Sequence, residues 1–162
     1  MDKREILERK ILGQEELERM LAFWRFKDKS VSLAYGTFDV LKPGSIEMII
    51  QAANKANVLL VAVKSDDLVA KQKGAGNPLN HQCNRAMALA AQMLVSGVYI
   101  VGSEDPSALV ELVKPAVIVH CKNSTEKEIS AFKKIIEREG EVLEVDTSTA
   151  IEQKTNSQCC CE

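Results

Sequence analysis

The sequence predicts an α/β protein: a single Rossmann-like, doubly wound sheet of about five parallel strands with helices on both faces. Short runs rich in valine, isoleucine and leucine alternate with longer segments whose apolar residues recur every three or four positions. The run 58–63 contains no polar residue, as expected for a central parallel strand that is covered on both faces. The 162 residues show neither an internal repeat nor a linker, so we expect one core.

The first thirty residues predict a helical lead-in. Apolar side chains at helical spacing favour helix from residue 1 to about residue 29, with a break at Gly13. From residue 31 onward strands and helices alternate. We expect strands at 31–35, 58–63, 98–101, 116–120 and 142–145. We expect helices at 44–56, 80–95, 105–113 and 125–139, with a last short helix after Ser148. The predicted division is a lead-in at 1–30, an α/β domain at 31–152 and a disordered polar tail at 153–162.

Composition and hydropathy argue against nucleic-acid and membrane partners, and they bear on the location of the protein and on its cysteines. The net charge of −2, the pI of about 5.8 and the 4% of aromatic residues argue against a nucleic-acid partner. No apolar run approaches the ~18 residues that span a bilayer, so we expect no membrane partner. The first residues lack the apolar core of a signal peptide, so we expect a cytoplasmic protein. The five cysteines have neither disulfide-framework nor zinc spacing, and the sequence assigns no role to Cys159–Cys161 and no metal site.

One stretch, 32–46, has the pattern of a phosphate site. An apolar strand ends in a glycine turn at Gly36, and a loop then leads into a helix that begins near Gly44. A helix N-terminus attracts anions because its free N–H groups and the positive end of its dipole point at them. In a doubly wound sheet, ligands bind at the carboxyl ends of the strands near the switch in strand order. We therefore expect the ligand at this turn.

The same stretch, Tyr35-Gly36-Thr37-Phe38-Asp39-Val40-Leu41, resembles the signature of the cytidylyltransferase-like superfamily of nucleotidyltransferases, T/N-G-x-F-D-x-x-H-x-G-H. Further segments are similar to the family in the same order. They are Leu59–Asp66, Lys73-Gly74, Pro78-Leu79-Asn80 with Arg85 after it, and Gly140-Glu141-Val142. Together with the leading helix they resemble most closely the adenylyltransferase (ADP-heptose synthase) domain of the bifunctional heptose kinase and adenylyltransferase. The resemblance covers about residues 12 to 152.

The resemblance implies nucleotidyl transfer from a nucleoside triphosphate, ATP or CTP, to a sugar phosphate or polyol phosphate, with release of pyrophosphate. It also implies Mg²⁺ as cofactor and a homodimer. Residue by residue, it implies nucleotide binding by Gly36, Thr37, Phe38, Asp39, Gly44, Ser45, Ser148 and Thr149. It implies catalytic roles for Lys42 and Lys73, and acceptor binding by Asp66 and Arg85.

The chain departs from the family pattern where catalysis is expected. Lys42 and Ser45 stand at the two positions where the signature has histidines. A lysine can replace one imidazole as a point charge but lacks its rigid geometry, and a serine is too short to span the same gap. Losing one such donor typically costs a factor of roughly 10²–10³ in rate. The sequence therefore leaves two hypotheses: an active enzyme, or a degenerate member that serves as a nucleotide-binding or oligomerisation module.

Several further positions stay open or are set aside. Ser148 and Thr149 fit either a helix start that faces phosphate or an ordinary helix cap. His120 and Cys121 are neighbours on a predicted strand, so their side chains point to opposite faces and do not form a catalytic pair. The segment His120–Asn123 and Asn77 also differ from the family pattern, which leaves the base and the acceptor unassigned.

Overall fold

The computed structural model describes residues 2–136 and 139–147, which form an α/β fold around one parallel sheet. The strands are β1 (Ile11–Leu12), β2 (Val31–Gly36), β3 (Val58–Lys64), β4 (Gly97–Val101), β5 (Val117–Cys121) and β6 (Glu141–Val145). The helices are α1 (Lys3–Glu8), α2 (Gln14–Phe26), α3 (Pro43–Asn54), α4 (Asp66–Lys73), α5 (Gln82–Ala90), α6 (Ser107–Val113) and α7 (Glu126–Lys133). The strand order is β1-β4-β3-β2-β5-β6, and each described pair is parallel. The predicted fold class is confirmed, with six strands in the described sheet rather than about five.

The strand beyond the expected five is β1, which lies in the predicted helical lead-in. The expectation of helix up to Gly13 is wrong from Arg9 onward, because α1 ends at Glu8. Ile11 pairs with Val98 of β4, and the Val98 N–H donates to the Lys10 carbonyl oxygen at 2.7 Å. The open edge of β4 thus offers backbone hydrogen bonds that outweigh the helical spacing of the side chains. Gly13 is the N-cap of α2, as the expected break at this residue implies.

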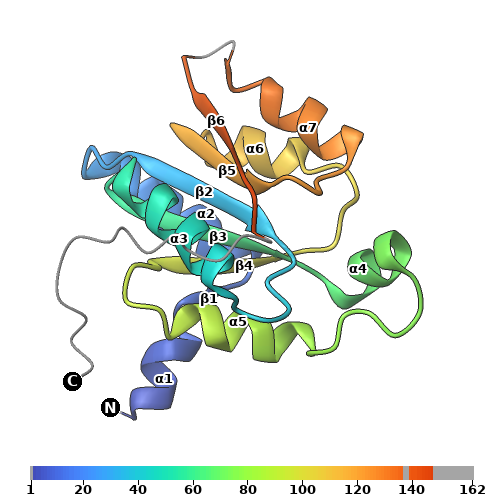
Figure 1. Cartoon of the computed structure of the whole chain (residues 1–162). Coiled ribbons are helices and arrows are strands. Elements are labelled where there is room, and N and C mark those ends of the chain that lie inside the picture. The colour runs from blue at the N-terminus through green and yellow to red at the C-terminus, as the bar shows by residue number, and fades with distance from the viewer. Residues whose placement is uncertain (1, 137–138, 148–162) are drawn as a thin grey trace, which may run out of the picture.

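Helices cover both faces of the sheet (Figure 1). On one face α2, α6 and α7 pack over strand side chains such as Leu33 and Tyr35. On the other face α3 and α5 pack over the alternate residues of the same strands, such as Ala34. The central strands β2 and β3 are buried along their whole length. Burial of both faces explains why these strands lack the alternation of polar and apolar residues seen in half-exposed sheets.

The change in strand order places a crevice beside β2. The chain runs from β2 outward through β3 to β4, and then returns to the other side of β2 for β5 and β6. The carboxyl ends of the strands lie at one edge, where α4 projects beyond the sheet (Figure 1). This is the edge at which doubly wound sheets bind ligands.

Several helices are shorter than the spacing of their apolar residues predicts. Helix α5 begins at Gln82 with His81 as its N-cap, and α6 begins after Pro106. The expected last helix with Ser148 and Thr149, and the expected tail at 153–162, lie outside the described residues. The division at residues 30 and 152 stays a prediction. Over the described ranges no helix is long and apolar enough to cross a membrane.

Because β1 and α2 belong to the same core as the sheet, we expect Leu21→Ala to destabilise the whole fold. Leu21 is 1% exposed, and its truncation should lower the free energy of unfolding by about 2–5 kcal/mol. Urea denaturation monitored by circular dichroism measures this. Phe23→Ala on the same helix is the control: Phe23 is 51% exposed, so its change should stay within about 0.5 kcal/mol. Equal effects of the two variants would contradict a lead-in that is integral to the core.

Candidate functional site

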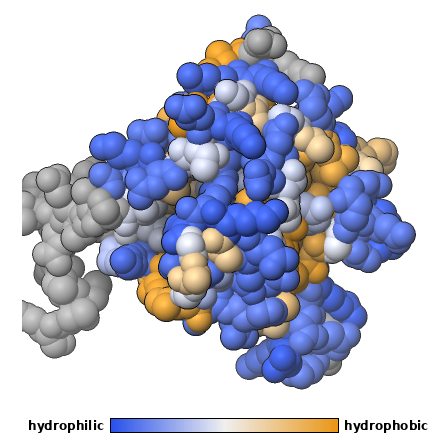
Figure 2. Space-filling model, turned by 90° about the vertical axis from the view of Figure 1, so that its right-hand side faces the viewer, coloured by the Kyte–Doolittle hydropathy of each residue, from blue (hydrophilic) through white to orange (hydrophobic). Residues whose placement is uncertain are grey.

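A cavity of about 540 Å³ opens at the carboxyl edge of the sheet, beside the switch in strand order. It is lined from the ends of β2, β3 and β5, from the start of α3, from the end of α4 and from Thr147 after β6. The lining residues are Gly36, Thr37, Phe38, Asp39, Val40, Lys42, Ser45, Met48, Lys64, Gln72, Lys73, Leu79, Cys121, Asn123, Thr125 and Thr147. The molecular face on this side is mostly hydrophilic (Figure 2). Such a setting suits a polar ligand rather than an apolar one.

The floor of the cavity is the turn after β2. Gly36 ends the strand, and a Cβ at this position would lie 3.1 Å from the ring of Phe38. Phe38 has a left-handed backbone, with φ of 50°, and its ring is buried in the core on the α3 side. A bulky residue in this region of φ carries strain, which is common where backbone is held for a ligand. The buried ring anchors the turn from beneath, so Thr37 and Asp39 face the cavity edge.

Asp39 fixes the turn against the segment that precedes α5. Its carboxylate accepts hydrogen bonds from the backbone N–H groups of Leu79 and Asn80, both at 2.8 Å, and the Asn80 amide donates to the Asp39 carbonyl oxygen at 2.8 Å. Burial alone would raise the pKa of Asp39. The hydrogen bonds from Leu79 and Asn80 outweigh it, so the pKa of this carboxyl lies below its ordinary value. Asp39 is therefore a charged clamp of the turn.

Arg85 holds the same turn from the core side. Its guanidinium is buried and donates to the Thr37 carbonyl oxygen at 2.6 Å, to the Asn80 carbonyl oxygen at 2.9 Å and to Asp66 at 2.6 Å. Neither Asp66 nor Arg85 lines the cavity. Their charged groups contact one another and the backbone, and in this way they position the turn. Acceptor binding by these two residues stays a prediction.

The start of α3 closes one side of the cavity. Lys42 is the N-cap and Pro43 follows it, and no side chain caps the first turn of the helix. Gly44 packs against the segment after β6 so closely that a Cβ would lie 2.6 Å from the Thr147 carbonyl oxygen. Ser45 is buried and lines the cavity, while Lys42 is exposed at its rim. The uncapped helix start and Lys42 thus present positive charge to the cavity.

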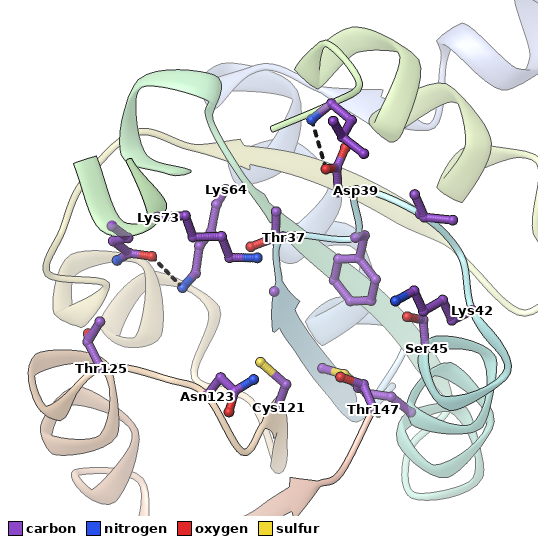
Figure 3. Close-up of a pocket in the computed structure, with 16 residues that line it drawn as sticks. Thr37, Asp39, Lys42, Ser45, Lys64, Lys73, Cys121, Asn123, Thr125 and Thr147 are labelled. Atoms are coloured by element: carbon purple, nitrogen blue, oxygen red, sulfur yellow. Dashed lines mark hydrogen bonds between the residues drawn. The ribbon is translucent and has the colours of Figure 1, made fainter. Parts of the chain in front are cut away.

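Lysines approach the cavity from opposite sides (Figure 3). Lys42 and Ser45 lie on the α3 side, and Lys73, at the end of α4, lies across from them. Lys73 is exposed, and Gly74 after it has φ of 88°. Of the residues predicted to bind nucleotide, the cavity brings together Gly36, Thr37, Phe38, Asp39 and Ser45, with Gly44 behind its wall. Ser148 and Thr149 lie outside the described residues.

Sequence reasoning missed a buried polar network at the α4 end of the cavity. The Lys64 ammonium lies 2.7 Å from Glu128 and 2.9 Å from the Gln72 side-chain oxygen. Glu128 forms a capping box with Thr125 at the start of α7. Two signals were available in the sequence: a lysine directly after an entirely apolar strand, and the pattern Thr-x-x-Glu before an apolar segment.

The strand pair His120 and Cys121 behaves as its alternation predicts. Cys121 lines the cavity, whereas His120 is buried and lies 5.2 Å from the ring of Phe132. The His120 Nδ1 atom lies 3.1 Å from the Ser124 hydroxyl and 3.0 Å from the Cys121 carbonyl oxygen. The imidazole is therefore engaged away from the Cys121 thiol.

The residues around the cavity do not form a cage for a resident metal ion. Within ranges 2–136 and 139–147, no group of three or more His, Cys, Asp or Glu side chains is placed to hold one. Asp39 is the carboxylate among the cavity-lining residues, and both of its oxygens already accept hydrogen bonds. Since Mg²⁺ is commonly bound through substrate phosphates with few protein ligands, this donor set fits an ion that arrives with a nucleotide as part of the substrate.

The family is decided by similarity over most of the chain. A family model described as cytidylyltransferase-like matches residues 33–159, which include the turn, the α3 start and the cavity-lining end of α4. The chain belongs to the cytidylyltransferase-like family. The resemblance drawn from the sequence is thereby confirmed, and membership supports nucleotidyl transfer as the general chemistry. It leaves the substrates open.

Related proteins add detail to this assignment. The chain is 35% identical over 140 residues to the bifunctional protein HldE of Rhodopseudomonas palustris (strain BisB5), and 34% identical over 140 residues to that of Bradyrhizobium sp. (strain ORS 278). Both matches cover 86% of this chain, but this chain spans only 29% of the length of those relatives.

Two solved structures share the fold at low sequence identity. The first is the lipopolysaccharide core biosynthesis protein from Thermoplasma volcanium GSS1, with a TM-score of 0.61, 19% identity, and coverage of 73% of this chain and 97% of that one. The second is pantoate-beta-alanine ligase from Francisella tularensis, with a TM-score of 0.57, 11% identity, and coverage of 83% and 65%. At these identities the likeness establishes the fold alone.

Because a Cβ at Gly44 would meet backbone, we expect Gly44→Ala to open the wall between α3 and the segment after β6. The free energy of unfolding should fall by about 1–3 kcal/mol, since the Cβ would meet backbone atoms of Thr147 rather than the end of a flexible side chain. Thermal denaturation checks this. Gly102→Ala is the matched control, since its nearest neighbour would be the Ser65 hydroxyl at 3.9 Å. A Gly44→Ala variant as stable as the wild type would contradict the close packing.

The Asp66–Arg85 clamp predicts a pH dependence. Burial alone would raise the pKa of Asp66, but the Arg85 guanidinium and the Gln82 N–H outweigh it, so the folded-state pKa lies below the ordinary value. As the pH falls below about 4, the unfolded chain takes up its proton first and stability is lost. Urea denaturation from pH 7 to pH 3 should show a less steep loss for Asp66→Asn than for the wild type. Parallel curves would contradict the clamp.

Proposed function

We propose that the chain binds a nucleoside triphosphate, ATP or CTP, in this cavity and transfers its nucleotidyl group to a phosphorylated small molecule, a sugar phosphate or polyol phosphate. The observation that carries the proposal is the arrangement of Lys42 and the uncapped α3 start opposite Lys73, around the glycine turn of β2. Positive groups on both sides of a polar cavity suit a ligand with several phosphates. Family membership supports the general chemistry.

In the proposed reaction a phosphate oxygen of the acceptor attacks the α-phosphorus in line with the leaving group. The new bond joins that oxygen to the α-phosphorus, and the bond between the α-phosphorus and the bridging oxygen breaks. Pyrophosphate leaves with the electron pair. Such a transfer needs positioning and charge stabilisation rather than a covalent role for the protein. Lys42 and Lys73 would balance charge on the phosphates from the two sides, and the turn at Gly36 and Thr37 would let them approach the backbone.

Mg²⁺ would enter with the triphosphate, as part of the substrate. The protein groups proposed to meet the phosphates are the two lysines, the Ser45 hydroxyl and the backbone at the α3 start. Asp39 keeps its hydrogen bonds to Leu79 and Asn80 and so holds the turn. A homodimer, as the resemblance implies, is part of this proposal.

A second candidate function is nucleotide binding without transfer. Lys42 and Ser45 favour it, because they stand where the family signature has histidines. The exposed Lys42 has a flexible stem, so its charge is less firmly placed than that of an imidazole. The cavity and its charges would then serve a binding or oligomerisation module.

Release of pyrophosphate separates the two functions. The chain is incubated with MgATP or MgCTP and a panel of sugar phosphates and polyol phosphates. We expect turnover that Lys42→Ala lowers by a factor of roughly 10²–10³. Lys55→Ala is the matched control: Lys55 lies at the other end of α3, outside the cavity lining, and pairs with Glu141 at the surface.

The remaining outcomes are equally decisive. Nucleotide binding without turnover would show that the protein is a nucleotide-binding module rather than an enzyme. If the two missing imidazoles are the reason, a variant that carries both Lys42→His and Ser45→His should gain turnover. Absence of nucleotide binding in calorimetry would overturn both functions.

A further inference from the structure

Lys64 is an unusual residue for the wall of this cavity. It is the last residue of β3, in a strand that is otherwise wholly apolar, and its side chain is only 5% exposed. The side chain nevertheless lines the cavity, on the same side as Lys73 (Figure 3). Its ammonium also lies 5.4 Å from the centre of the Tyr35 ring. A nearly buried cation thus borders a cavity that is otherwise approached by exposed lysines.

Glu128 balances this charge but is shared among several donors. One of its oxygens lies 2.7 Å from Lys64, accepts from the Gln72 amide at 3.0 Å and accepts from the Tyr35 hydroxyl at 3.4 Å. The other accepts from the Thr125 N–H at 2.9 Å. Burial alone would raise the pKa of Glu128, yet the contacts from Lys64, Thr125 and Gln72 lower it below its ordinary value. The carboxylate is therefore ionised and its charge is spread over four partners.

The ammonium, in contrast, retains capacity for a ligand. A lysine has three N–H donors. The structure gives Lys64 two oxygen partners, on Glu128 and on Gln72. Burying an ion pair is costly, and an apolar pair of similar volume is often as stable or more stable. The stability of the fold is thus a weak reason for a lysine at this position. A cation held in place beside the cavity can instead bind an anionic group of a ligand.

We propose that Lys64 binds a phosphoryl group of the ligand in this cavity, and that Glu128 and Gln72 are positioning residues that hold its ammonium in place. This inference rests on the proposed function, because it assigns one more contact of the same site. The phosphoryl group would lie at the α4 end, between Lys64, Lys73 and Asn123. It belongs either to the triphosphate or to the phosphorylated acceptor.

Calorimetric titration of the full chain with three probes tests this assignment: MgATP, inorganic tripolyphosphate and glucose 1-phosphate. The test variant carries Lys64→Met and Glu128→Gln, which leaves no unpaired charge and keeps an acceptor for the Thr125 N–H. We expect it to melt no lower than the wild type and to bind the phosphate probe roughly 10- to 100-fold more weakly. Loss for MgATP and tripolyphosphate assigns Lys64 to the triphosphate, and loss for glucose 1-phosphate alone assigns it to the acceptor.

Two further variants keep the test decisive. Glu128→Gln alone removes a negative charge but keeps a side-chain oxygen that, with Gln72, can still hold the ammonium. Phosphate affinity should therefore be kept or increased even if the melting temperature falls. A purely structural network would make affinity follow the melting temperature in all variants and would overturn the inference. Lys71→Met is the control, since Lys71 lies on α4 outside the cavity lining and faces Glu104.

The same titrations distinguish failure of the role of Lys64 from failure of the proposed nucleotidyl transfer. Unchanged binding of every probe by the double variant, with MgATP still bound in a manner that depends on Lys42, overturns the role of Lys64 and leaves the proposed function standing. Binding of tripolyphosphate that depends on Lys64, without binding of MgATP, overturns the proposed function and leaves Lys64 as a phosphate-binding residue. Binding of none of the probes by the wild type overturns both.

Discussion

The buried carboxylate of Glu128 is the contact on which the arrangement around the cavity depends. Its partners come from β2 through Tyr35, from β3 through Lys64, from α4 through Gln72 and from the N-cap of α7 through Thr125. These side chains converge at the carboxyl edge of the sheet, where the network adds to the buried Leu68 and Val69 in holding α4. A buried polar network is favourable only when each of its polar groups has a hydrogen-bond partner. The network around Glu128 therefore favours one relative placement of the elements that it joins.

A second network fixes the turn of β2 beside the cavity. Asp39 binds backbone N–H groups from one side, and Arg85 binds the Thr37 carbonyl oxygen from the other. The turn is therefore positioned by groups that are themselves engaged, which leaves the lysines, the Ser45 hydroxyl and the α3 start to meet a ligand. This division suits a protein whose chemistry consists of placing anions and balancing their charge. It also explains how the turn is retained although Lys42 and Ser45 stand where the family signature has histidines.

The sequence predicted the features that depend on local pattern. The parallel sheet follows from apolar runs such as 58–63, and the ligand edge follows from the glycine turn at Gly36. It failed where tertiary contacts decide. Strand β1 exists because β4 has an open edge, which no pattern within Ile11–Leu12 reveals. Arg85 matched a family segment, but its contact with Asp66 became visible only in the fold. The Lys64–Glu128 pair joins residues 64 positions apart, so its signals became meaningful only in three dimensions.

The central claim is that one cavity, bordered by cations from α3, β3 and α4, takes the phosphates of a nucleotide. A crystal structure of the full chain with a non-hydrolysable triphosphate analogue and Mg²⁺ tests it most directly. We expect the phosphates beside the turn at Gly36, with oxygens within hydrogen-bonding distance of the α3 start and of at least one of Lys42, Lys64 and Lys73. A nucleotide bound outside this cavity, or bound in it without contact to any of the three lysines, would contradict this role of the cavity.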